Sequence, residues 1–250
     1  MNEDRRNRIA ELVAEKKAVT NAEIMARFGI SIETVRRDLA YLESKGLIER
    51  VYGGAAARVF RREEPTYFRR EHTREAEKSA IAAVAAGMTG ACKNIFFDIG
   101  TTVERIARLV DDLSVNAFTN SMRTAITLSE KGCAVTVPGG NMRPVEFSVS
   151  GVLAENNMDL FNVDLAFIGA AGMDETGVTD FIPDEAHFRS RVIEHASRVI
   201  VAADSSKCAV RALCRVCSWS DVDMLITDAG APKPLLSVIA DKGVEIVIAK

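Results

Sequence analysis

The segment "DIGTT", Asp98 to Thr102, ends an apolar run with a glycine and two hydroxyl side chains. At the first turn of a helix these hydroxyls would lie beside unpaired backbone N–H groups, and such a helix end favours an anion. Two cations, Arg143 after "PGG" and Lys207 in "ADSSK", would complete a phosphate site. Each feature alone is weak, because a Gly-Thr-Thr turn is more often a plain connection and a single cation is more often surface charge. The Walker sequence Gly-x-x-x-x-Gly-Lys-Ser/Thr is absent.

A second group of interest is the adjacent pair Arg36 and Arg37, in a chain whose formal net charge is −3. Arginine forms bidentate hydrogen bonds to guanine and also binds DNA phosphates. The alternative is that Glu33 and Arg37, four residues apart, form an ordinary ion pair on a solvated helix face. For an isolated arginine pair the second interpretation is the better one, so the surrounding elements must decide.

Those elements begin with a helix expected at residues 3–16, where apolar residues recur at helical spacing. Thr20 and Glu23 fit the capping-box pattern at the start of a second, short helix that ends near Phe28. Gly29 then allows a tight turn. Three helices around such a turn indicate a helix-turn-helix.

The third helix is expected to begin at its cap, Ser31, and to end after Lys45, where Gly46 follows. Arg37 lies opposite the apolar stripe of this helix and Arg36 lies at its flank. The stripe consists of Ile32, Val35, Leu39 and Leu42. The arginines are therefore expected on the exposed face.

After the third helix, "LIERVYGGA" reads as a β-hairpin, with Gly53 and Gly54 suited to positive φ at its tip. A helix-turn-helix with such a wing places its third helix in the major groove. We expect Arg37 to read a base, and Lys45 and Arg50 mostly to bind phosphates. The full set of expected DNA contacts is Ser31, Glu33, Thr34, Arg36, Arg37, Lys45, Arg50, Tyr52 and Gly53.

The rest of the chain contains seven short β-rich runs, most of them followed by a turn and a helix-like segment: "NIFFDIG", "VNAFTNS", "AVTVPGG", "VDLAFIG", "RVIVAAD", "VDMLITD" and "VEIVIA". This alternation predicts an α/β domain whose mostly parallel sheet is covered on both faces. Ligands of such sheets bind beyond the carboxyl ends of the strands. Small polar residues gather there, namely Asp98, Gly100, Thr101, Thr102, Asn120, Ser121, Gly139, Gly140, Gly169, Gly172 and Asp204, beside Arg143 and Lys207.

Composition narrows the class of protein. The chain has 250 residues with 48% apolar content, and it has neither an apolar leader nor a run of roughly 18 apolar residues. We therefore expect a soluble, cytoplasmic protein. Residues 1–72 hold 15 Lys and Arg against 12 Asp and Glu, whereas residues 73–250 hold 17 against 23, so the basic character is N-terminal.

Five cysteines are expected to be reduced, and "CRVC" lacks the second pair that a zinc site needs. No metal or cofactor is expected.

The run "ISIETVRRDLAYLESKGLIERVYGGA" resembles the signature of DeoR-type repressors of bacterial sugar metabolism. The resemblance continues in "DIGTT", "TNS", "GAAGMDETGVT" and "ADSSK". It implies a sensor domain with the fold of ribose-5-phosphate isomerases and coenzyme A transferases, a phosphorylated sugar as effector, and Glu185 and Arg189 in the binding site. This chain departs from the family pattern at Tyr52 (usually His), Ile99 (usually small or polar), Arg189 (usually Lys) and Cys208 (usually Phe).

The sequence thus predicts a repressor that is not an enzyme, with a winged helix-turn-helix at residues 1–56, a linker at 57–74 and an effector-sensing α/β domain at 75–250. Its expected partners are double-stranded operator DNA, a phosphorylated sugar and a second copy of itself, as a homodimer or homotetramer. No membrane partner is expected. Two alternatives stay open: a sugar-phosphate isomerase with an accessory DNA-binding module, and a DNA-binding protein without an effector.

Overall fold

The computed structural model describes residues 2–16, 18–44, 48–51, 53–57, 59–60 and 64–250. The chain divides into two compact units, unit 1 at Met1–Phe60 and unit 2 at Arg61–Lys250. Lys45, Gly46 and Tyr52, which the sequence singles out for the third helix and the wing, lie outside the described residues.

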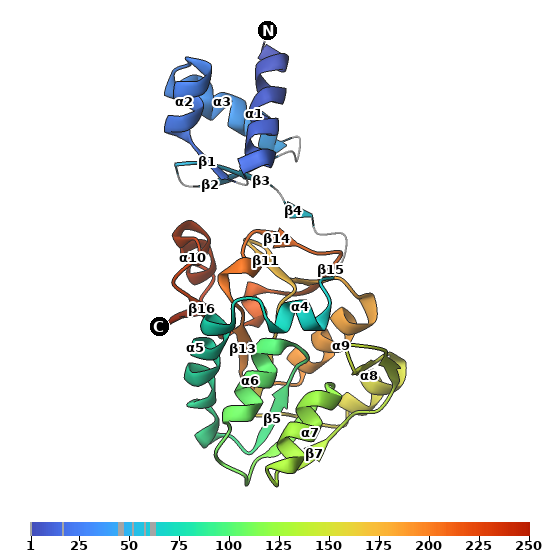
Figure 1. Cartoon of the computed structure of the whole chain (residues 1–250). Helices are drawn as coiled ribbons and strands as arrows, with labels where there is room; N and C mark the ends of the chain where they lie inside the picture. Colours follow the sequence, from blue (N-terminus) through green and yellow to red (C-terminus); the bar gives the residue numbers. More distant parts are fainter. Residues whose placement is uncertain (1, 17, 45–47, 52, 58, 61–63) are drawn as a thin grey trace. The chain divides into compact units, whose positions relative to one another are not determined.

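Unit 1 contains the three expected helices and the expected hairpin (Figure 1). Its elements are α1 (Asn2–Lys16), β1 (Ala18–Thr20), α2 (Asn21–Phe28), α3 (Ile32–Ser44), β2 (Ile48–Val51), β3 (Gly54–Ala57) and the short β4 (Val59–Phe60). The strand β1 was not anticipated, and it pairs antiparallel with β3, so that the wing is a three-stranded sheet in the order β1-β3-β2. The prediction of a winged helix-turn-helix is confirmed.

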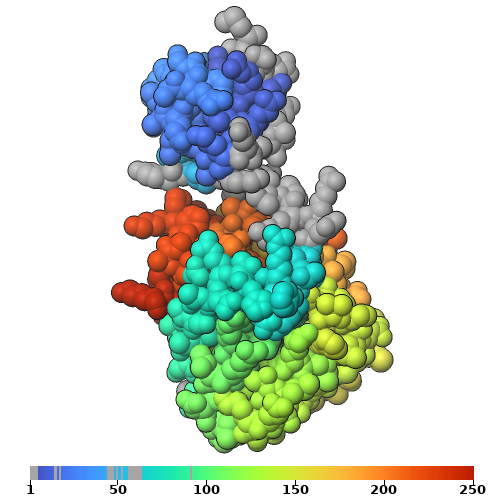
Figure 2. All heavy atoms as spheres, in the orientation of Figure 1, coloured from blue at the N-terminus to red at the C-terminus, as the bar shows by residue number. Residues whose placement is uncertain are grey.

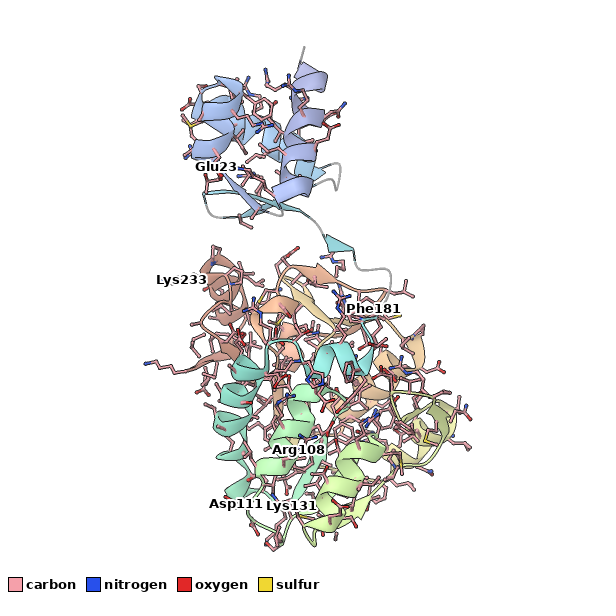
Figure 3. The ribbon with its side chains drawn as sticks, in the orientation of Figure 1. Glu23, Arg108, Asp111, Lys131, Phe181 and Lys233 are labelled. Atoms are coloured by element: carbon pink, nitrogen blue, oxygen red, sulfur yellow. The ribbon has the colours of Figure 1, made fainter. Side chains whose placement is uncertain are left out.

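The capping box at the start of α2 is formed as predicted, with Glu23 in the first turn of the helix (Figure 3). The backbone N–H of Glu23 donates to Thr20 Oγ1 at 3.2 Å, and that of Thr20 donates to Glu23 Oε2 at 2.8 Å. At the wing, only Gly53 has the expected positive φ, +80°. Gly54 is needed for a different reason, because a Cβ there would lie 2.1 Å from the carbonyl oxygen of Val19 in β1.

Asp38 in α3 is buried, although it is charged, and it ties α3 to α1. One carboxylate oxygen lies 2.7 Å from Nε of Arg5, and the other lies 2.8 Å from Nε of Arg6. Burial raises the pKa of Asp38, but the two arginines outweigh burial and hold that pKa below its usual value. The helix-turn-helix therefore has an ionic clamp beside its apolar core of Val35, Leu39 and Leu42.

Unit 2 is built on a seven-stranded sheet in which every neighbouring pair is parallel. The strand order is β17-β16-β13-β10-β5-β6-β7. These strands are β5 (Asn94–Phe97), β6 (Asn116–Thr119), β7 (Ala134–Thr136), β10 (Leu165–Ile168), β13 (Val199–Ala202), β16 (Met224–Asp228) and β17 (Glu245–Ala249). All seven runs predicted from the sequence are strands of this sheet, which confirms the predicted fold class.

Helices cover both faces of the sheet. They are α4 (Tyr67–Glu71), α5 (Glu75–Ala86), α6 (Thr101–Leu109), α7 (Met122–Glu130), α8 (Val152–Met158), α9 (Pro183–Glu194) and α10 (Lys233–Ala240). Successive residues of a strand face opposite sides. Ile95 and Phe97 accordingly pack in one core cluster with residues of α5 and α6, and Phe96 packs in the other with Phe188 of α9. The helix α4 lies in the segment expected to be a linker, yet its Tyr67 is buried in unit 2.

Short antiparallel strands beyond the main sheet were not anticipated. They are β8 (Asn141–Arg143), β9 (Ser148–Ser150), β11 (Gly172–Asp174), β12 (Gly177–Asp180), β14 (Val210–Arg211) and β15 (Cys214–Ser218), with 3-10 turns at Thr89–Ala91, Ser205–Lys207 and Trp219–Asp221. The fully buried indole of Trp219 donates to the Asp174 carbonyl at 2.7 Å.

All five cysteines are free thiols. None of the helices in the described ranges is long and apolar enough to cross a bilayer.

Candidate effector pocket and nucleic-acid interface

The helix α3 presents the predicted DNA-binding side chains on its outer face. Glu33, Arg36 and Arg37 are exposed, and Thr34 is half-buried, with its hydroxyl 3.1 Å from that of Ser31. The alternative ion pair between Glu33 and Arg37 is not formed, and within the described part of unit 1 neither Arg36 nor Arg37 makes an ion pair. Both guanidinium groups are therefore available to an anionic partner.

The wing carries two further predicted contacts. Arg50 is exposed on β2, where its backbone N–H donates to Glu43 Oε1 at 3.1 Å and its Nη1 lies 3.8 Å from Glu43 Oε2. Gly53 is exposed at the turn that follows. Lys45 and Tyr52, which complete the predicted set, are outside the described residues. The predicted DNA contacts that the structure describes thus lie on one helix face and the adjoining hairpin.

The pocket of unit 2 lies where the connections of the sheet change direction. From β5 the chain continues through β6 and β7 to one edge, and it then returns to β10 and continues through β13 to the other edge. Loops that leave β5 and β10 therefore diverge, which opens a crevice at the carboxyl ends of these strands. Gly100, Thr101 and Thr102 line it after β5, and Gly169 lines it after β10.

The helix α6 begins at this pocket. Gly100, its N-cap, has φ +124°, a conformation that favours glycine, and no side chain caps the helix. Thr101 and Thr102 are the first two helical residues and line the pocket. Unpaired N–H groups and two hydroxyls are thus brought to one point, the arrangement that the sequence predicted for an anion.

Arg189 of α9 lines the pocket and is buried together with two carboxylates. Its Nε lies 2.7 Å from Asp98 Oδ2, and its Nη1 lies 2.5 Å from Asp180 Oδ2. Asp98 Oδ2 also accepts the backbone N–H of Gly169 at 3.0 Å, which joins the two loops of the crevice. Burial alone would lower the pKa of Arg189, but Asp180 and Asp98 outweigh it and raise that pKa above its usual value. Arg189 is charged and neutralised within the protein.

Three other cations line the same pocket: Arg70, Lys78 and the predicted Lys207. The adjoining recess shares these three residues and adds Arg69 and the predicted Asp204. Burial lowers the pKa of Lys78 to about 8. Arg70 and Lys78 were not predicted from the sequence. The burial of Lys78 could have been predicted from the helical periodicity, because this lysine lies on the same face of α5 as the apolar, buried Ile81, Ala82 and Ala85.

Arg143 and Glu185, also expected in the pocket, lie instead in a cluster of carboxylates. Arg143 Nη1 donates to Glu64 Oε2 at 2.6 Å, and its Nε lies 3.0 Å from Glu185 Oε1. Glu185 accepts the hydroxyl of Ser148 at 2.5 Å. Neither Arg143 nor Glu185 lines the pocket or the recess.

The remaining predicted residues have separate positions. Ser121 caps α7, accepting the Thr124 N–H at 3.2 Å, while the side chain of Asn120 is fully buried and has no hydrogen-bond partner among the described residues. Gly139 and Gly140 have φ of +78° and +109° in the connection after β7. Gly172 lies where a Cβ would be 2.2 Å from the Val210 carbonyl oxygen. None of these five residues lines the pocket.

Clusters of at least three His, Cys, Asp or Glu side chains that could hold a metal ion do not occur in the described ranges. Cys214 and Cys217 of "CRVC" both lie on β15, and Cys217 is buried among apolar residues. Burial raises the pKa of the Cys217 thiol to about 12, so this thiol is protonated at neutral pH.

Comparison with known proteins now decides the family. Residues 5–58 match the DeoR-like helix-turn-helix domain, and residues 73–229 match the DeoR C-terminal sensor domain. The chain belongs to the DeoR family. Among its relatives are the HTH-type transcriptional regulator GlpR of Haloferax volcanii, 35% identical over 98% of this chain and 96% of the relative, and the glycerol-3-phosphate regulon repressor of Escherichia coli K12, 31% identical over 97% of each. Ribose-5-phosphate isomerase A of Methanocaldococcus jannaschii aligns with 54% of this chain and 55% of its own at 18% identity, with a TM-score of 0.42.

The match to the DeoR sensor domain covers most of the pocket. Lys78, Thr101, Thr102, Arg189 and Lys207 fall inside the part matched by the sensor domain, whereas Arg70 lies just before it. The pocket of this DeoR-family chain therefore includes a residue from the segment between the two matched domains.

Proposed function

We propose that this DeoR-family protein is a transcriptional repressor that binds operator DNA through unit 1 and is released by a phosphorylated sugar bound in unit 2. The observation that carries the proposal is the pocket at the carboxyl ends of β5 and β10. It combines an uncapped helix N-terminus with the cations Arg70, Lys78 and Lys207. A phosphate group uses both features, and hydroxyl groups of a sugar suit the polar side chains of the adjoining recess.

We propose DNA binding at residues 1–56 and effector binding at 75–250, as the sequence suggested, joined by a linker at 57–74 whose later part, α4, belongs to unit 2 and adds Arg70 to the pocket. The separation of unit 1 from unit 2 after Phe60 supports it. A single winged module covers one half-site, so specific affinity calls for a homodimer or homotetramer and for repeated half-sites.

The pocket is proposed to bind its ligand without transforming it. An isomerase needs a carboxylate that is free to accept a proton. Of the carboxylates around the pocket and its recess, Asp180 is paired with Arg189, and Glu64 is paired with Arg143. Asp204 accepts the Ser206 N–H at 3.0 Å through one of its oxygens. The pairing of Asp180 and Glu64 with arginines supports a sensor over the isomerase alternative.

Arg37→Ala should weaken binding to the operator by about 1–3 kcal/mol, because a bidentate contact with a base is lost. Binding to random DNA should weaken much less. The operator is first selected from a random pool with the wild-type protein, and both proteins are then titrated against both DNAs. Equal losses on the two DNAs would show that Arg37 contacts only phosphates.

A phosphorylated sugar should weaken operator binding at least about tenfold. This requires the binding free energy of the sugar to be about 1.4 kcal/mol more favourable for the free protein than for the DNA-bound protein. The measurement is operator binding across glycerol 3-phosphate, pentose and hexose phosphates, and their unphosphorylated parents. Thr101→Val removes one pocket hydroxyl at nearly constant volume, so it should raise the sugar phosphate concentration needed for release and leave binding without effector unchanged.

Thr127→Val is the matched control for that experiment. Thr127 lies on α7, and its hydroxyl donates to the Arg123 carbonyl at 3.0 Å, outside the pocket. This variant should respond to effector as the wild-type protein does. The proposed function is wrong if no phosphorylated sugar in the panel releases the wild-type protein from its operator.

A further inference from the structure

The short helix α4 forms a wall of the pocket in unit 2. Its Arg70 lines both the pocket and the adjoining recess, together with Lys78 and Lys207. Figure 2 shows the surface of α4 and the start of α5, in cyan, across the middle of one face of unit 2. In sequence α4 begins seven positions after Phe60, the last residue of the DNA-binding unit. A ligand in the pocket would therefore touch the segment that continues into unit 1.

Arg70 is held away from full engagement with the pocket by two glutamates. Its Nη1 donates to Glu64 and its Nη2 donates to Glu146. Its Nε is buried and has no acceptor within the described residues. The guanidinium group thus has a spare donor beside the pocket, and its other donors are bound to groups that a phosphate could replace.

The two glutamates would not be left without a counter-ion if Arg70 changed partner. Arg143 Nη1 lies 2.6 Å from Glu64 Oε2, and its Nη2 lies 3.9 Å from Glu146 Oε2. This places Arg143 where it can keep both carboxylates paired. The position of Arg143 outside the pocket, which the sequence did not anticipate, thereby makes the exchange of Arg70 feasible.

Other contacts of α4 lead to α6, whose first turn lies in the pocket. The Tyr67 hydroxyl donates to Glu104, and Arg105 Nη2 donates to the Glu71 carbonyl at 3.1 Å. The Tyr67 N–H donates to Glu146 Oε1 at 3.1 Å. The Arg70 backbone carbonyl accepts a hydrogen bond from Lys78 Nζ. Residues 64–71 are thus fastened to Lys78, which lines the pocket, and to α6, whose first turn lines it too.

We infer that Arg70 is an effector ligand that exchanges partners: an anionic group in the pocket takes its guanidinium from Glu64 and Glu146, and this loosens residues 64–71. The inference rests on the proposed function for the site and adds its route of regulation. Bidentate pairing with phosphate replaces two carboxylate contacts, so only an anion of similar charge density drives the exchange. Residues 64–71, once loosened, hold the chain that leads into the DNA-binding unit less tightly.

Two variants test this inference with inorganic phosphate as the probe. Arg70→Met should weaken phosphate binding, measured by calorimetry, about tenfold, because one charged donor group is lost. Glu146→Gln should strengthen it several-fold, because a competitor for Arg70 is neutralised while the amide oxygen of the new side chain still accepts the Tyr67 N–H. A merely structural role for this cluster predicts weaker binding in both variants. Arg74→Met is the control, since exposed Arg74 pairs with Glu77 beyond the pocket.

Hydrogen exchange supplies the second readout on the full chain. Saturating phosphate should speed amide exchange in residues 64–71 of the wild-type protein. In Arg70→Met this exchange should already be fast and should not respond. Fluorescence of the buried Trp219 checks that each variant is folded. The inference is overturned if Arg70→Met binds phosphate as tightly as the wild-type protein, or if Glu146→Gln binds it more weakly.

The operator assay separates this inference from the proposed function. If sugar phosphates release the wild-type protein and release Arg70→Met at the same concentrations, Arg70 has no part in the switch and the proposed function stands. If no sugar phosphate releases the wild-type protein, the proposed function fails, whatever phosphate does to residues 64–71.

Discussion

Replacing Arg189 with methionine should lower the free energy of unfolding of unit 2 by about 3–5 kcal/mol. Methionine fills a similar volume, so packing is largely kept. The loss arises because Asp98 and Asp180, both buried, lose the cation between them. Burial already raises the pKa of Asp98, so without Arg189 each carboxylate must either stay charged without a partner or take up a proton, and both outcomes cost stability. This is the largest single-residue effect that we expect in the molecule.

Trp219 makes that measurement specific for unit 2. It is the one tryptophan of the chain and is fully buried, so its fluorescence reports denaturant unfolding of this unit. Arg191→Met is the matched control on the same helix, because Arg191 pairs with Asp159 and Glu194 at the surface. The control should unfold at the denaturant concentration of the wild-type protein. A similar midpoint for Arg189→Met would mean that the buried carboxylates become protonated without appreciable loss of stability.

Asp38→Ala should destabilise unit 1 by about 2–3 kcal/mol, because two charge-assisted hydrogen bonds between α3 and α1 are lost. The effect is smaller than that of Arg189→Met because Arg5 and Arg6 are 22% and 19% exposed and regain water when the carboxylate is removed. Amide hydrogen exchange in residues 5–44 should speed up accordingly, while the unfolding midpoint reported by Trp219 stays the same.

Glu33→Ala is the control for Asp38→Ala, since it removes a carboxylate from an exposed position of the same helix. It should leave exchange in unit 1 close to that of the wild-type protein. Should both variants behave alike, the buried clamp would contribute no more than an ordinary surface charge.

The strands of the main sheet could be predicted because their residues are apolar on both sides. In β5 and β10 every residue from Ile95 to Phe97 and from Leu165 to Ile168 is buried, so no other element type fits so short a run. The strands β8 to β15 outside the main sheet could not be predicted in this way. They are mostly three or four residues long and are defined by partners elsewhere in the chain.

The helix-turn-helix followed from local signals, namely the capping box at Thr20 and the turn at Gly29. Asp38 did not, since its partners Arg5 and Arg6 are more than thirty positions away. A charged residue between Val35 and Leu39 reads locally as a break in the apolar stripe. The three-dimensional structure alone shows that it is a buried contact between two helices.

The pocket was predicted in part. Gly100, Thr101 and Thr102 could be placed because the end of a parallel strand and the start of its helix are fixed by topology. The cations could not be assigned in the same way. Whether Arg70 or Arg143 faces the ligand depends on Glu64, Glu146 and Glu185, which reach the cluster from three separate segments.

The strand order also bears on how the chain folds during synthesis. The strands β5, β6 and β7 leave the ribosome consecutively, but the other edge of β5 is paired only by β10, where Ile95 lies opposite Leu165. At the usual rate of translation this gap lasts on the order of several seconds. During that time an apolar edge strand is unpaired, which is a template for association with other chains. Unit 1, whose sheet and helices are complete by then, has no such delay, so chaperone binding to the nascent chain should be concentrated on the half-sheet β5-β6-β7.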